Sequence, residues 1–186
     1  MAVDPPASTS EQLVEWAHGV AASARAGGSP RSSLRLLDAD SLHLTLCFLG
    51  SRPVGEIDAL AAALAPHAEQ SCELSVGAPL WLPPRRPHAL AVEVHDHDGE
   101  LQRIHERVQA ALCGASAWRP ERRRFRPHIT LARVRRSERS TREQPLPATP
   151  WLSFQPQAIV LYRSWLTPAG ASYEALASSE LAVAGR

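Results

Sequence analysis

The sequence predicts an α+β fold in which helices pack on the outside of antiparallel β-sheets. Long segments carry apolar residues at helical spacing, and most of the other apolar segments alternate with the strand period of two. The turns between successive strands are too short for parallel crossovers, which need about a dozen residues or more. No linker is long enough to separate independent domains, so a single domain over residues 1–186 is expected.

The first third of the chain is predicted to form a helix, short strands and a second helix. The first helix is expected to begin at Ser8, because this residue and Glu11 form a capping-box pattern ahead of an apolar helical face. Strand material follows on both sides of a turn at residues 38–40. A second amphipathic segment, residues 54–64, is expected to end near Pro66.

The rest of the chain is predicted to be strands with one further helix. This helix is expected to begin at Asp98 and to stop near Gly114. Its apolar stripe comprises Leu101, Ile104, Val108 and Leu112. A polar loop is expected from residue 135 to about residue 150, and a turn at residues 168–170. The strands are expected over residues 72–83, 87–95, 126–134, 158–165 and 172–181.

The composition argues against several classes of protein. No stretch approaches the roughly 18 uninterrupted apolar residues of a membrane span, and the N-terminus has neither the basic head nor the apolar core of a signal peptide. We therefore place the chain in the cytoplasm and expect no membrane association. The three cysteines are widely spaced and suggest neither a disulfide framework nor a zinc site. We expect no metal, no cofactor and, because nothing suggests an obligate interface, a monomer.

The basic residues are unusual in type and in position. All 20 are arginine, so mechanisms that use a phosphate-loop lysine, a lysine Schiff base or a lysyl-nucleotide intermediate are excluded. Ten of these arginines lie between residues 119 and 142, a stretch with only two acidic residues. Such a cluster attracts phosphate groups, but a solvated arginine-rich loop explains the charge equally well.

Two separate segments, "HLTL" and "HITL", repeat a histidine and a threonine two residues apart. Side chains alternate along a strand, so His43 shares a face with Thr45, and His128 shares a face with Thr130. The leucine and isoleucine residues between and after them point to the opposite face, where they fit a core. A single pair of this kind arises often by chance, whereas two copies in the same apolar frame predict a functional site.

Paired histidines suit in-line displacement at phosphorus. One group must take a proton from the attacking oxygen while the other donates a proton to the leaving oxygen. The ordinary imidazole pKa lies near 6.5, so one histidine can be neutral and the other protonated at neutral pH. The threonine hydroxyls beside them can donate hydrogen bonds to the phosphoryl oxygens as charge develops. This chemistry requires no metal.

With two HxTx motifs, the chain resembles the 2H phosphoesterase superfamily. The segments "HLTLCFLG", "FRPHITLARV" and "VLYRSWLTPAGASYEAL" are most similar to the RNA 2',3'-cyclic phosphodiesterases, historically called 2'-5' RNA ligases. The resemblance implies a bilobal fold of two antiparallel sheets with outer helices, with pseudo-two-fold symmetry and the motifs facing a central cleft. It also implies hydrolysis of a terminal 2',3'-cyclic phosphate on RNA to a 2'-phosphate. The expected partners are RNA 3' ends of this type or small cyclic nucleotides.

The resemblance also assigns roles to the site residues. It implies that His128 is the general base on water, that His43 is the acid for the departing O3', and that Thr45 and Thr130 hold the phosphate. Arg133 matches a recurrent family arginine that would bind phosphate.

The position of Arg133 needs a structural explanation. Strict alternation places it on the face opposite His128, so it must lie beyond the strand end or after a bulge. Arg126, on the His128 face, is an alternative phosphate ligand. Phe48 and Trp165 are candidates for stacking a base, although core positions explain them better.

Other interpretations stay open. The segment "HDHDGE" at residues 95–100 carries potential metal ligands, but turn and cap residues explain it better. The old family name suggests RNA ligation by reversal of the cleavage, and the arginine cluster suggests a non-catalytic module that binds RNA or nucleotides. Only Met1-Ala2-Val3 precede the Asp4-Pro5-Pro6 turn. Family members usually have a longer strand there, so either the first strand is shortened or the chain starts upstream.

Overall fold

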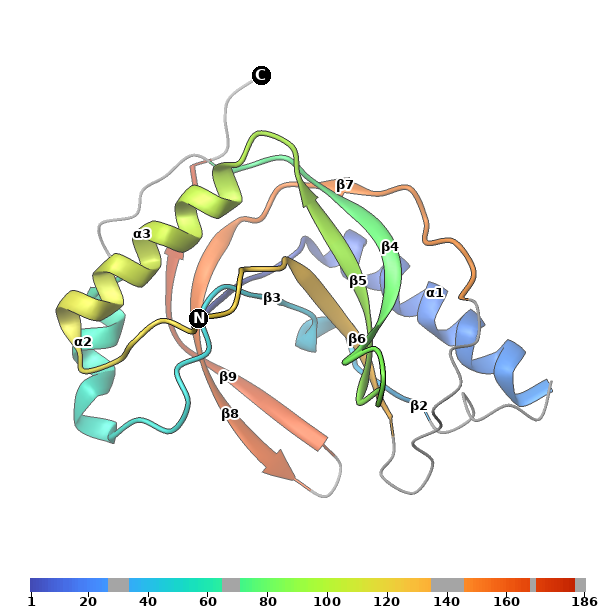
Figure 1. The fold of residues 1–186 in the computed structure, drawn as a ribbon, viewed down its shortest axis with the longest axis horizontal. Coiled ribbons are helices and arrows are strands. Elements are labelled where there is room, and N and C mark those ends of the chain that lie inside the picture. Colours follow the sequence, from blue (N-terminus) through green and yellow to red (C-terminus); the bar gives the residue numbers. More distant parts are fainter. Residues whose placement is uncertain (27–33, 65–70, 135–145, 168–169, 183–186) are drawn as a thin grey trace.

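A single hydrogen-bonded β-sheet organises the fold (Figure 1). The computed structural model describes residues 1–26, 34–64, 71–134, 146–167 and 170–182. Within them, nine antiparallel strands are arranged in the order β7-β4-β5-β6-β3-β1-β8-β9, and β2 pairs with β6. The strands are β1 (Ala2–Val3), β2 (Leu34–Leu36), β3 (Leu44–Thr45), β4 (Leu74–Leu82), β5 (Ala89–Asp96), β6 (His128–Val134), β7 (Ser153–Phe154), β8 (Ala158–Thr167) and β9 (Gly170–Glu180).

The helices lie toward opposite ends of the molecule. Figure 1 shows α1 on one side, and α2 and α3 together on the other. Helix α1 contacts β2 and β6, whereas α3 contacts β5 and α2. The helical segments are α1 (Ala7–Ala26), the 3-10 turns η2 (Ala39–Ser41) and η3 (Val54–Glu56), α2 (Ile57–Ala62) and α3 (Glu100–Ala115). Among the described residues, no helix has both the length and the apolar character that a bilayer span requires.

The predicted α+β class is confirmed, with antiparallel strands and helices outside them. The structure adds that the two halves of the sheet are continuous, because β3 pairs with β6 on one side and with β1 on the other. One core cluster includes Leu13 of α1 and Leu101 of α3. The division into two pseudo-symmetric lobes stays a prediction. Helix α2 ends at Ala62, ahead of the stop expected near Pro66. The turn at residues 168–169 and the arginines at positions 135–142 lie outside the described residues.

The predicted capping box at the start of α1 is wrong. The helix begins at Ala7, and the carbonyl oxygen of Pro6 accepts the amide of Ser10 at 3.0 Å. This is the first i to i−4 bond of the helix, so Pro6 occupies the capping position and Ser8 lies inside the first turn. The proline pair ends the extended segment and places the capping position two residues earlier than the side-chain pattern indicates.

Helix α3 buries its apolar stripe as predicted, but its ends differ from the prediction. Leu101, Ile104, Val108 and Leu112 are all buried. Gly99 precedes the helix with a φ of 70°, a left-handed conformation that glycine adopts without strain. The carboxylate of Asp96, rather than that of Asp98, accepts the amide of Gln102 at 2.9 Å. Gly114 lies within the helix, which continues to Ala115.

We expect Asp96→Ala to lower the free energy of unfolding by about 0.5–2 kcal/mol, the usual cost of a lost helix cap. The reason is that this carboxylate satisfies an amide in the first turn of α3. Asp98→Ala is the matched control, and its effect should stay within about 0.5 kcal/mol. Urea denaturation of the three proteins checks the prediction, and an equal cost for both variants would contradict it.

Candidate functional site

The two HxT motifs lie side by side on adjacent strands. Leu44 of β3 pairs with Ile129 of β6 in an antiparallel register. Continuing this register places each histidine opposite the threonine of the other motif: His43 opposite Thr130, and His128 opposite Thr45. Directly opposite Cβ atoms in such a ladder are about 4.5–5.5 Å apart and diagonal pairs about 7–8 Å. The register therefore brings two imidazoles and two hydroxyls to one small patch of the sheet.

Both histidines are held by the same backbone hydrogen bond. The Nδ1 of His43 lies 3.0 Å from the carbonyl oxygen of Ser41, and the Nδ1 of His128 lies 2.7 Å from that of Arg126. A carbonyl oxygen only accepts, so each Nδ1 carries a proton and donates it. In the neutral imidazole the lone pair is therefore on Nε2. Each histidine thus has Nε2 available to accept or deliver a proton.

The threonine hydroxyls and Arg133 complete this patch. Within the described residues, neither Thr45 nor Thr130 has a hydrogen-bond partner for its hydroxyl, and both line the cavity described below. The pairing of β5 with β6 shifts register, because Leu90 pairs with Ala132 and Ala91 with Thr130. The extra residue on β6 is a β-bulge, which reverses the alternation of side chains.

The bulge places Arg133 on the histidine face. Leu131 and Ala132 are buried in succession, and Arg133 then points to the side of His128 and Thr130. The sequence alone required Arg133 to lie beyond the strand end or after a bulge, and a bulge is present. Arg133 lines the cavity with both histidines and therefore lies where a phosphate bound between them would be in reach.

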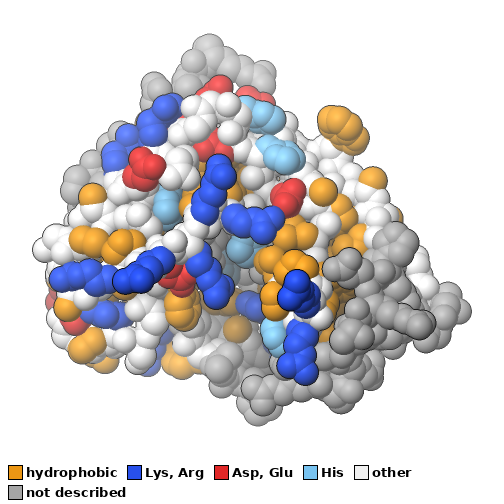
Figure 2. Space-filling model, in the orientation of Figure 1, with side chains coloured by type: hydrophobic (Ala, Val, Ile, Leu, Met, Phe, Trp, Pro, Cys, Tyr) orange, Lys and Arg blue, Asp and Glu red, His pale blue; other side chains and the backbone are white. Residues whose placement is uncertain are grey.

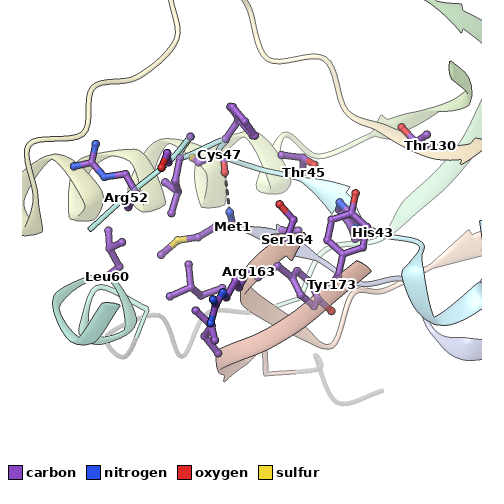
Figure 3. A pocket seen from close by; sticks show the side chains of 18 of the residues that line it. Met1, His43, Thr45, Cys47, Arg52, Leu60, Thr130, Arg163, Ser164 and Tyr173 are labelled. Atoms are coloured by element: carbon purple, nitrogen blue, oxygen red, sulfur yellow. Dashed lines mark hydrogen bonds between the residues drawn. The ribbon is translucent and has the colours of Figure 1, made fainter. Parts of the chain in front are cut away.

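A cavity of about 880 Å³ contains the patch (Figures 2 and 3). Figure 2 shows basic side chains around a hollow in this face of the molecule. The volume lies toward the upper end of the range of roughly 300–1,000 Å³ for small-molecule sites. The described lining contains no aspartate or glutamate. Its ionisable side chains are those of Arg52, Arg123, Arg133 and Arg163, of His43, His88 and His128, of Tyr162 and Tyr173, and of Cys47.

Two tyrosines of the β8–β9 hairpin form the wall around His43. The ring of Tyr173 meets the imidazole edge-on with centroids 4.7 Å apart, and the ring of Tyr162 lies 5.7 Å away. The hydroxyl of Tyr162 donates to the carboxylate of Asp4 at 2.6 Å, which fixes this wall. Burial lowers the pKa of His43 below its ordinary value, and the positive charges of the N-terminal ammonium and of Arg133 lower it further.

Of the other predicted site residues, Arg126 and Trp165 do not line the cavity, whereas Phe48 does. Arg126 is exposed, its guanidinium is 3.4 Å from the carboxylate of Glu93, and it does not line the cavity. The expectation that Phe48 and Trp165 belong to the core is wrong, because their side chains are 67% and 38% exposed. Phe48 lines the cavity instead. Phe48 lies beyond the end of β3, where alternation no longer assigns a side chain to the core. Trp165 lies within β8, paired with Ser172 of β9, and its ring contacts the Arg163 guanidinium.

The remaining candidates, the possible metal ligands at residues 95–98 and the thiol of Cys47, do not form a second reactive site. In the segment at residues 95–98, Asp96 caps α3 and the Nε2 of His97 hydrogen-bonds to Ser75 at 2.8 Å. Among the described residues, no three histidine, cysteine or carboxylate side chains cluster as metal ligands. Cys47 lines the cavity, but burial raises its pKa to about 11, so its thiol is protonated at neutral pH and is no nucleophile.

Several cavity residues were missed from the sequence. Tyr162, Arg163 and Tyr173 lie in the closing segment that carries part of the family resemblance, yet no spacing rule relates them to the histidines. Arg52 and Arg123 lie in irregular segments before η3 and before β6. Only the tertiary fold brings these side chains to the cavity.

The chain belongs to the 2'-5' RNA ligase superfamily of 2H phosphoesterases. Residues 5–164 match this family. An RNA 2',3'-cyclic phosphodiesterase of Aeropyrum pernix is 30% identical over 166 residues, which cover 82% of this chain and 89% of that protein. The resemblance seen in the sequence is thereby confirmed at the level of the family.

Solved structures show the same fold. The crystal structure of TT0787 of Thermus thermophilus matches with a TM-score of 0.73 at 25% identity, covering 97% of this chain and 95% of that chain. The structure of Escherichia coli LigT complexed with phosphate matches with a TM-score of 0.70 at 25% identity, covering 97% and 94%. The large antiparallel sheet with few helices is thus an architecture of this family.

The lowered pKa of His43 predicts a loss of stability in acid. The unfolded chain takes up a proton at this histidine near pH 6.5, whereas the folded protein resists protonation until lower pH. The free energy of unfolding should therefore fall as the pH drops through and below that value. We expect His43→Gln to show a smaller decrease between about pH 7.5 and about pH 5.5 in urea denaturation. An unchanged pH dependence would contradict this origin.

Proposed function

We propose that this protein hydrolyses terminal 2',3'-cyclic phosphates of RNA to 2'-phosphates by paired histidine catalysis. The observation that carries the proposal is the in-register pairing of the two HxT motifs, which supplies two Nε2 atoms on one side of the sheet. The relative from Aeropyrum pernix is an RNA 2',3'-cyclic phosphodiesterase, and Escherichia coli LigT binds phosphate. Both support a phosphodiester as the substrate.

The reaction is a displacement by water. One neutral imidazole accepts a proton from the attacking water through Nε2 as the new P–O bond forms. The P–O3' bond breaks, and the other imidazole, protonated, gives its Nε2 proton to O3'. The product is a 2'-phosphate monoester. The histidines end with exchanged protonation states and return to the initial state by proton exchange with solvent.

The remaining residues of the patch suit the transition state. Negative charge develops on the non-bridging phosphoryl oxygens, and the hydroxyls of Thr45 and Thr130 are free to donate to them. Arg133 supplies a fixed positive charge that is oriented toward the same space by the bulge. With an acid, a base and three donors, the protein side chains account for each step of this hydrolysis without a metal.

The roles of the histidines are a finer part of the proposal. The family resemblance gives His128 the role of base and His43 the role of acid. In the free protein, the lowered pKa of His43 favours its neutral form. A bound phosphate anion raises the pKa of a neighbouring imidazole, because it stabilises the protonated form. We therefore propose that His43 becomes the acid when substrate binds.

Two other functions rest on the same site. RNA ligation by reversal of the cleavage would use the same two histidines, whereas ligation through a lysyl-adenylate is impossible in a chain without lysine. A non-catalytic module that binds RNA would need the arginines but not both histidines. The presence of both histidine–threonine pairs in one register favours the enzyme.

We expect protein in excess EDTA to convert a short RNA with a 2',3'-cyclic phosphate end into the 2'-phosphate form. His43→Ala and His128→Ala should each lower kcat/KM by about 10²–10⁴-fold, the usual contribution of a general acid or base. Chromatography of the product ends checks the outcome. Binding without turnover by the wild-type protein would favour the non-catalytic module.

We expect the two histidine variants to differ on a substrate with a better leaving group. In bis(4-nitrophenyl) phosphate the departing phenolate needs little protonation, so loss of the general acid costs less. His43→Ala should therefore lose less activity on this ester than on the cyclic phosphate, whereas His128→Ala should lose as much on both. The reverse pattern would exchange the two roles and leave the paired mechanism intact.

A further inference from the structure

We propose that the cavity contains a second phosphate site, centred on Arg163, which binds a phosphate on the 5' side of the terminal ribose. This inference rests on the proposed function, because it assumes that the scissile phosphate lies at the histidines. It makes the preferred ligand a nucleotide with at least two phosphates.

The cavity carries more positive charge than one phosphate needs. Four arginines line it, and the lining has no described carboxylate. Arg52 forms an ion pair with Glu56 at 2.7 Å. Within the described residues, no ion pair is made by Arg123, Arg133 or Arg163. Arg133 belongs to the histidine patch, so two unneutralised guanidinium groups remain.

Arg163 is held in place without an anion. Its guanidinium carbon lies 4.6 Å from the centre of the Trp165 ring, in a cation–π contact on the same face of β8. Stacking uses the flat face of the guanidinium and leaves its N–H groups on the edge available as donors. A planar, pre-oriented arginine is well suited to bidentate contact with a phosphate.

Arg163 lies apart from the histidine patch. In Figure 3, Arg163 and Arg52 lie toward α2 and Leu60, whereas His43 and Thr130 lie at the other end of the cavity. One phosphate at the histidines therefore leaves the Arg163 end empty. A nucleotide that reaches both ends places a second phosphate there, and the 5' oxygen of the same ribose is the position where a nucleotide carries it.

Two kinds of ligand share this chemistry. The second phosphate is either the internal phosphodiester of an RNA chain or the 5'-phosphate of a mononucleotide. Both present anionic oxygens to Arg163, so the test must include one ligand of each kind.

The test measures binding, so that it does not depend on turnover. Isothermal titration compares adenosine 2'-phosphate with adenosine 2',5'-bisphosphate, and with the dinucleotide ApA that carries a terminal 2'-phosphate. We expect the wild-type protein to bind both of the larger anions at least about tenfold more tightly, since a charge-assisted hydrogen bond contributes on this scale. Arg163→Gln should reduce this ratio toward one, and Arg163→Lys should give an intermediate ratio.

Arg103→Gln is the matched control. It removes one arginine from the exposed face of α3, where the guanidinium pairs with Glu100 at 2.7 Å outside the cavity. The affinity ratio should stay at the wild-type value in this variant. Circular dichroism of each protein establishes that the variants are folded.

The outcomes separate the proposals. A ratio near one in the wild-type protein, or a ratio that Arg163→Gln leaves unchanged, overturns the second site. An Arg163-dependent gain for the dinucleotide supports the site and assigns it to an RNA chain, whereas a gain confined to the 5'-phosphate supports the site and assigns it to a mononucleotide. If the second site holds while no cyclic phosphate is hydrolysed, the proposed hydrolysis fails and the site remains.

Discussion

The antiparallel pairing of Leu44 with Ile129 is the constraint on which the candidate site depends. Both side chains are fully buried in the core, and their neighbours in each strand point the other way. A slip of one residue would bury the histidines and expose the leucine and isoleucine, so the hydrophobic core itself enforces the register. The same apolar contacts that stabilise the sheet therefore hold the two histidine–threonine pairs together.

The two motifs have the same frame but different surroundings. Both histidines donate from Nδ1 to the carbonyl of the residue two positions earlier, which fixes the same tautomer and leaves Nε2 free. His43 alone is walled by Tyr162 and Tyr173, which come from the far end of the chain. Two like groups in unlike environments are a common basis for separate acid and base roles. The β8–β9 hairpin thus bears on the chemistry of a motif that lies in the first third of the sequence.

The orientation of two cavity arginines, Arg133 and Arg163, depends on irregularities in the strands that carry them. Arg133 reaches the histidine side only because a β-bulge at Leu131 and Ala132 reverses the alternation of β6. Arg163 is on the long β8–β9 hairpin, whose register also shifts once, and it is oriented by stacking on Trp165. Among the described residues, neither arginine forms an ion pair and the cavity lining holds no acidic side chain, so both charges are available to an anionic ligand.

The sequence by itself determined the fold class, the amphipathic face of α3 and the pairs of residues that share a strand face. These features follow from the spacing of residues along the chain. The strand period of two, for example, places His43 on the same face as Thr45, and His128 on the same face as Thr130. It also required that Arg133 lie beyond a strand end or after a bulge. The choice of the bulge, the cap on Asp96 and the exposure of Phe48 were decided by the tertiary structure, as was the meeting of Tyr173 with His43. Each of these depends on contacts between segments far apart in sequence or on a local irregularity, and neither leaves a periodic signal that the sequence alone would reveal.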